Sequence, residues 1–125
     1  MLLVVRRRGG STLDDVRALE PDLVPCIQLC DGPLTAPEAL QLPAELPLGM
    51  KADGSVLQVE ARAQREVPGE GGFPLAELLA AVPVGTPISL EVPHARLQAQ
   101  LSAHEFATYN VRAVRALLAR AGTPV

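Results

Sequence analysis

Residues 60–71 read Glu60-Ala-Arg-Ala-Gln-Arg-Glu-Val-Pro-Gly-Glu-Gly71, a polar helical run that ends in a Pro-Gly-Glu-Gly turn. Pro68 stops the helix because its ring fixes φ and removes a backbone donor, and Gly69 and Gly71 permit backbone angles or close approaches that a side chain would forbid. Arg65 lies just before the turn, so its fork of N–H donors is expected to project from a rigid loop. A surface turn with a solvated arginine fits the same letters, and this alternative stays open.

A short apolar segment lies on either side of this turn, and each is interrupted by a polar residue. The first is Val24–Leu29 with Gln28, and the second is Pro87–Val92 with Glu91. Apolar runs of this length between turn residues are typical of buried strands. Strands that direct polar side chains to one rim, with Arg65 on a loop between them, predict a site for a small molecule.

The remaining pattern alternates short strands with helices, apart from an irregular, proline-rich excursion over Thr35–Gly54. The predicted strands are Leu2–Val5, Val24–Leu29 and Ile88–Val92. The predicted helices run from a cap at Ser11 or Thr12 to about Glu20, from a cap at Ser55 over Val56 to about Glu66, over Pro74–Val82, and onward from Ser102. Apolar strands that alternate with helices indicate a parallel sheet covered on both faces.

This order predicts an α/β fold of parallel (β/α) units forming a single domain over residues 1–125. A complete (β/α)8 barrel needs about 250 residues, whereas this chain has 125 and starts within a predicted strand. We therefore expect a partial TIM barrel, corresponding to the C-terminal portion of a (β/α)8 barrel.

The last helix has the clearest start signal. Ser102-Ala-His-Glu105 is a capping-box pattern, in which the serine bonds a first-turn N–H and the glutamate reaches back. Gly122 suits the position after the helix end, and His104 is expected to be solvated. The predicted apolar stripe consists of Phe106, Tyr109, Ala113, Leu117 and Ala121.

Composition narrows the class of protein. A net charge of −3 and few aromatic residues argue against a nucleic-acid partner, since Arg6–Arg8 is the only basic cluster. No apolar run approaches the ~20 residues of a membrane span, so we expect no membrane partner and a cytoplasmic location. Cys26 and Cys30 do not form a zinc-binding pattern and are expected to be small buried side chains beside Gln28.

Side-chain alternation along the strands places the candidate site residues. If Ile88 and Leu90 face the helices, Glu91 faces the other side of the sheet at the carboxyl end of its strand, where barrel enzymes carry their active sites. Gln28 has the same parity, and its amide oxygen suits Mg²⁺ or Mn²⁺. Asp31, just past the strand end, is a candidate substrate contact or a hydrogen-bond acceptor behind the ligands. A solvated Glu91 and a satisfied core Gln28 remain the alternative.

These residues also carry a resemblance. The segments Gln28-Leu-Cys-Asp31, Arg65-Glu-Val-Pro-Gly-Glu-Gly71 and Ile88-Ser-Leu-Glu-Val-Pro93 resemble the sugar phosphate isomerase/epimerase family, which has xylose isomerase-like TIM barrels. The resemblance implies that Glu91 and Gln28 are metal ligands for Mn, Mg or Co, that Glu91 is catalytic, and that Arg65 binds a sugar or polyol substrate. It also implies a mechanism in which the metal chelates a carbonyl and its adjacent hydroxyl, and a carboxylate removes the acidified proton to give an enediolate.

The resemblance also implies ligands that this chain does not supply. The family's aspartate and histidine fall at about Met1 and Val4, and the other metal glutamate falls upstream of Met1. We therefore expect the chain alone to be an incomplete enzyme that depends on a missing N-terminal half. A non-catalytic half-barrel that forms a homodimer or docks on a partner is the alternative. An apurinic endonuclease relative would need a histidine-rich zinc cluster, which His94 and His104 do not provide.

Overall fold

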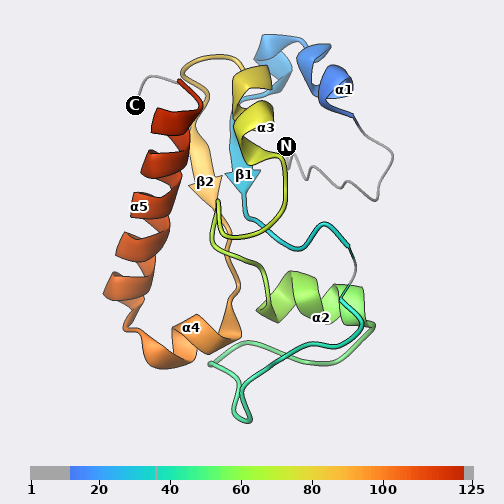
Figure 1. Ribbon diagram of the computed structural model, residues 1–125, viewed down its shortest axis with the longest axis vertical. Coiled ribbons are helices and arrows are strands. Elements are labelled where there is room, and N and C mark those ends of the chain that lie inside the picture. The colour runs from blue at the N-terminus through green and yellow to red at the C-terminus, as the bar shows by residue number, and fades with distance from the viewer. Residues whose placement is uncertain (1–11, 36, 123–125) are drawn as a thin grey trace.

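The computed structural model describes residues 12–35 and 37–122. Figure 1 shows a small sheet in the middle of the molecule, with α2 and α4 beyond the carboxyl ends of its strands and α1 near the opposite end. In chain order the elements are α1 (Leu13–Arg17), a 3₁₀ turn (Pro21–Leu23), β1 (Ile27–Leu29), α2 (Val56–Ala63), α3 (Leu75–Ala81), β2 (Ile88–Leu90), α4 (Ala95–Gln100) and α5 (Ala103–Arg120).

The sheet consists of β1 and β2, which run parallel with Ile27 opposite Ile88, Gln28 opposite Ser89 and Leu29 opposite Leu90. The predicted mixture of helices with a parallel sheet is therefore confirmed. The described sheet has two strands and is not a barrel. The predicted strand at Leu2–Val5 lies outside the described residues.

The core lies on one face of this sheet. Ile27 and Leu29 are almost fully buried and belong to one apolar cluster with residues of α1, α3 and α5. The other members of the buried cluster are Val16, Val24, Leu75, Leu78, Leu79, Val114 and Leu117. Because successive side chains of a strand point to opposite faces, Gln28 and Ser89 lie on the other face, and neither belongs to the cluster.

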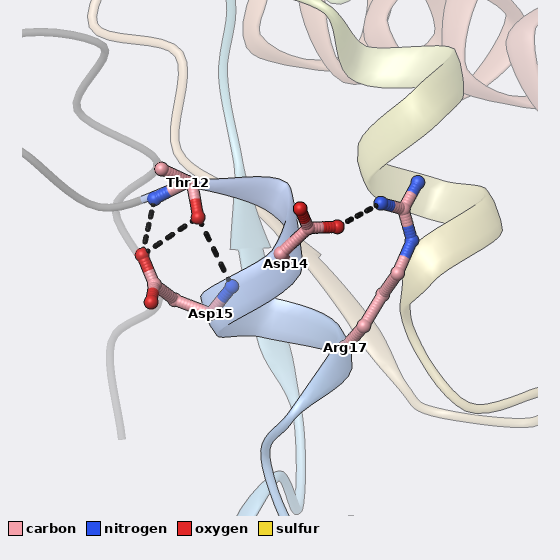
Figure 2. A network of polar contacts seen from close by, with 4 residues as sticks. All are labelled: Thr12, Asp14, Asp15 and Arg17. Atoms are coloured by element: carbon pink, nitrogen blue, oxygen red, sulfur yellow. Dashed lines mark hydrogen bonds and ion pairs between the residues drawn. The ribbon is translucent and has the colours of Figure 1, made fainter.

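The first helix begins at the predicted cap. The Thr12 hydroxyl accepts the Asp15 N–H at 3.2 Å, and the Asp15 carboxylate accepts the Thr12 N–H at 2.6 Å (Figure 2). Asp14 pairs with Arg17 on the exposed side of the same turns. The helix ends at Arg17 and not near Glu20, because Pro21 lacks the N–H that would continue it and begins a 3₁₀ turn.

The last helix also begins as predicted, with Ser102 and Glu105 forming a capping box, and Gly122 follows its end with a φ of 68°. The predicted apolar stripe is partly wrong. Of the predicted residues, Leu117 is buried. The other buried residues of the helix are Val114 and Asn110, whereas Tyr109 is 40% exposed. The Asn110 amide donates to the Phe106 carbonyl, so a polar residue takes a buried place on this face.

Two features after β2 were not predicted. Residues 95–100 form α4, and the preceding His94 caps it by accepting the Leu97 N–H on Nδ1 at 3.5 Å. The predicted strand end at Val92 shortens to Leu90.

The proline-rich excursion is confirmed over residues 37–54, which carry no helix or strand.

Candidate functional site

The carboxyl end of the sheet brings several of the predicted site residues together. Gln28 lies opposite Ser89, and in the next row the Glu91 N–H donates to the Leu29 carbonyl at 3.1 Å. Cys30 and Glu91 therefore follow Gln28 and Ser89 on the face that the core does not cover. Gln28 is half-buried and Glu91 is exposed, so both are accessible to a ligand.

From strand geometry, the Cα atoms of Gln28 and Glu91 are about 8 Å apart, since they differ by one strand spacing and two residues of rise. This separation allows both side chains to reach the same small ligand. Their position on one face follows from strand alternation together with the observed register.

Asp31 lies just past the end of β1, as expected, but its side chain is buried. Its carboxylate is 1% exposed and accepts three backbone N–H groups, from Gly32 at 2.8 Å, Gly69 at 2.8 Å and Phe73 at 3.0 Å. Backbone amides on both oxygens compensate for the burial of this charge. Because both carboxylate oxygens are buried and accept N–H groups of the turn, Asp31 is not placed for a direct substrate contact; its other expected role, as an acceptor behind the ligands, stays a prediction.

The turn that Asp31 holds is closely fitted. The Asp31 N–H donates to the Glu66 carbonyl and the Glu66 N–H donates to the Asp31 carbonyl, each at 3.0 Å. A Cβ on Gly71 would overlap Asp31 Oδ1 and come to 2.6 Å from Gly32 N. Gly69 has a φ of 91°, which favours glycine. The two glycines quoted from the sequence are therefore required by close approach and by a positive φ.

Arg65 precedes this turn and is fixed at both its backbone and its side chain. Its N–H donates to the Pro93 carbonyl at 3.0 Å, and its Nη1 donates to Glu60 Oε1 at 2.6 Å. The side chains of Arg65 and Glu60 are 17% and 6% exposed, so this ion pair is largely withdrawn from water. The solvated-arginine alternative is thus wrong, although part of the guanidinium still reaches the surface.

Cys30 lies among these charges. Burial raises the pKa of its thiol; the Arg65 cation opposes that rise, whereas Glu91, Asp31 and Glu60 add to it. The thiol is free and half-buried. It stays protonated near neutral pH and acts as a neutral neighbour of Glu91.

Two members of this region were missed from the sequence. Glu60 precedes Arg65 by five residues across a helix end, a spacing outside the familiar i,i+4 helical pair. Glu60 could have been noticed as a charged residue on the buried face of α2, which also carries Val59 and Ala63. Cys30 was treated only as a small buried side chain, and its place beside Glu91 depends on the strand register.

A second polar region lies under α4. His94 is 5% exposed, and its Nε2 lies 3.6 Å from Glu66 Oε2. Burial lowers the pKa of His94, with Glu66 opposing the shift and Arg96 adding to it. A small hollow of about 50 Å³ next to His94 is also lined by Gln64, whose buried Oε1 has no hydrogen-bond partner. The hollow is large enough for water, which would satisfy this oxygen.

The described residues do not form a complete metal centre. Within residues 12–35 and 37–122, no group of three or more His, Cys, Asp and Glu side chains is arranged to hold a metal ion. Gln28 and Glu91 remain the oxygen donors on the open face. They would suit a hard divalent cation only with further ligands.

In the part of the chain that the structure describes, none of the helices is both long and apolar enough to span a bilayer. Comparisons with family models, curated proteins and solved structures find no match to this chain.

Proposed function

We propose that this chain is the C-terminal part of a sugar or sugar phosphate isomerase/epimerase-like protein and that it binds a sugar or polyol on the open face of its sheet. The observation that supports the proposal is the shared position of Gln28, Glu91 and Arg65 at the carboxyl end of two parallel strands. Active sites of parallel (β/α) folds lie at this end. The partial TIM barrel belongs to the same proposal.

The chemistry of these side chains suits proton transfer next to a carbonyl. The exposed Glu91 carboxylate can accept a proton from the carbon beside the carbonyl and return it to the neighbouring carbon or the opposite face. The Arg65 N–H groups that Glu60 does not use can donate to the oxygen on which negative charge develops. The Gln28 amide can both donate to and accept from substrate hydroxyls.

The described residues do not by themselves fit the divalent metal (Mn, Mg or Co) that the family resemblance implies. Gln28 and Glu91 provide two oxygen donors, and no larger group of metal-ligating side chains is present in residues 12–35 and 37–122. A tightly bound ion would therefore need ligands from outside this part of the chain, and no step of the proposed chemistry is assigned to one.

Ligand binding tests this proposal directly. The ¹⁵N-labelled chain would be titrated with xylitol, an uncharged polyol, with and without Mg²⁺, and followed by NMR. We expect shifts at the Gln28 side-chain amide, Cys30, Glu91 and Arg65. Glu91→Gln should weaken them without altering the α5 resonances, whereas Glu77→Gln, which changes an exposed carboxylate on α3, should not. Shifts confined to the helical face, or the same affinity in Glu91→Gln, would remove this site from consideration.

Self-association is the second candidate function. The face that carries Gln28 and Ser89 lies outside the apolar cluster, and within the described residues each strand has a partner strand on one edge only, which favours pairing. Light scattering separates the candidates. A dimer that does not bind xylitol would support a non-catalytic half-barrel, whereas a monomer that binds xylitol would support the small-molecule site.

A further inference from the structure

We propose that Asp31 is a positioning residue of this site: its buried carboxylate fixes the turn over residues 67–73 and thereby sets Arg65 in place relative to Glu91. The inference rests on the proposed function for its meaning, since Arg65 and Glu91 are the groups that would contact substrate. Its structural part depends only on the contacts of Asp31.

The Asp31 carboxylate contacts the turn directly. Asp31 Oδ2 accepts the Gly69 N–H, and Oδ1 accepts the N–H groups of Gly32 and Phe73. A single carboxylate thus joins the end of β1 to both sides of a glycine-rich turn. Without it, three buried or half-buried donors would lose their acceptor. No apolar side chain of similar size could replace this function.

Two backbone bridges connect the segment that carries Arg65 to the ends of both strands. Residues 64–66 cross the carboxyl end of the sheet: Glu66 pairs with Asp31 beyond β1, and Gln64 pairs with His94 beyond β2. Arg65 lies between these two bridges, and its N–H donates to the carbonyl of Pro93, two residues after Glu91. The backbone position of Arg65 is therefore set by pairing at both strand ends: the Asp31 backbone pairs with Glu66 on the β1 side, and the Asp31 carboxylate holds the turn that follows Glu66.

The backbone of the turn also lies very close to Asp31 and its neighbours. The Gly71 backbone approaches Asp31 so closely that a Cβ there would overlap Oδ1, and a Cβ on Gly32 would meet Phe73 Cζ at 2.9 Å. The turn thus lies close against Asp31, with no room for a side chain between them. The Glu60–Arg65 ion pair, at 2.6 Å, then fixes the direction of the guanidinium on this backbone.

Amide hydrogen exchange and side-chain NMR test the inference in the full chain. In wild type, the Gly69 and Phe73 amides should exchange slowly, and the Arg65 Nε–H signal should be sharp. In Asp31→Asn, where an amide group replaces one acceptor oxygen, we expect both amides to exchange about tenfold faster or more. The Arg65 Nε–H signal should shift or broaden, and the apparent Kd for xylitol should rise about tenfold.

All variants would be compared under conditions in which they remain folded, as verified by urea unfolding, so that a loss of global stability does not imitate a positioning effect. Glu77→Gln removes an exposed carboxylate and is the matched control. An unchanged Arg65 signal in folded Asp31→Asn overturns the inference even if xylitol binds. If wild type does not bind xylitol, the proposed function fails, while the Arg65 signal still decides the positioning role.

If Asp31→Asn does not fold, Gly71→Ala perturbs the same contact from the other side and should displace the Arg65 signal. If neither variant folds, the wild-type exchange rates decide. Slow exchange at Gly69, Phe73 and Arg65 together supports the inference, and fast exchange at Gly69 and Phe73 overturns it.

Discussion

Replacing Glu60 by Gln should test whether the Glu60–Arg65 pair stabilises the fold. The substitution keeps the shape of the side chain but leaves the Arg65 guanidinium, which is 17% exposed, without a carboxylate. Removing one partner of a fully buried pair costs about 3–5 kcal/mol. Because Arg65 keeps some contact with water and the glutamine oxygen can still accept a hydrogen bond, we expect the free energy of unfolding to fall by about 2 kcal/mol.

A double-mutant cycle with Glu60→Gln and Arg65→Gln, measured by urea unfolding, would isolate the interaction between the two side chains. The exposed pair of Asp14 and Arg17, with side chains 88% and 54% exposed, is the matched control and should give less than about 0.5 kcal/mol. Added salt should weaken the exposed pair more than the buried one. A Glu60–Arg65 coupling as small and as salt-sensitive as that of Asp14–Arg17 would refute this reasoning.

Three further predictions concern the turn, the last helix and the buried histidine. Gly71→Ala should lower the free energy of unfolding by about 2 kcal/mol, because its Cβ overlaps Asp31; an unchanged urea midpoint would contradict the close contact. Ser102→Ala should cost about 1 kcal/mol by removing the cap of α5, which thermal unfolding followed by circular dichroism would detect. Burial lowers the pKa of His94 from its usual 6.5. As the pH falls below about 6.5, the unfolded chain therefore binds a proton that the folded chain does not, and the free energy of unfolding should decrease until the pH reaches the folded-state pKa. His94→Gln should flatten this pH dependence, whereas His104→Gln, at an exposed position, should leave it in place.

The parts of the fold that follow from local chemistry were predictable from the sequence. Thr12, Ser55 and Ser102 each begin a helix with a capping box. Ser55 and Ser102 were expected to cap, and Thr12 was one of two candidates for the first helix. These signals depend on contacts three residues apart along the chain, so they can be read without knowing the rest of the structure.

The presence of the two strands was predictable, but their lengths were not. Apolar runs around Ile27 and Ile88 indicated strands, and the structure pairs these two residues. The predicted strands were longer than the observed three-residue segments. Pairing along a strand requires a neighbour at every residue, and beyond Leu29 and Leu90 the chains separate to meet residues 64–66 instead. That crossing segment is a long-range feature with no local signal.

The candidate site shows the same division between local and long-range information. The alternation of side chains predicts that Gln28 and Glu91 share one face, and it depends only on strand geometry. It could not distinguish Asp31 from Glu91, since both are carboxylates next to a strand end. The distinction comes from the turn some forty residues later in the chain, whose amides at Gly69 and Phe73 reach Asp31 and not Glu91.

The difference between these two carboxylates supports the assignment of their roles. A buried carboxylate is retained where its oxygens accept enough hydrogen bonds to offset lost hydration, as at Asp31, and its acceptors are then unavailable to a ligand. Glu91 is exposed, and the Arg65 N–H donates to the carbonyl of Pro93, two residues after it in the chain. A group that exchanges protons with a substrate must be reachable and must not have its acceptors filled by the protein. Of the two carboxylates, Glu91 is the one accessible for the proposed proton transfer, whereas the Asp31 carboxylate is occupied by the turn.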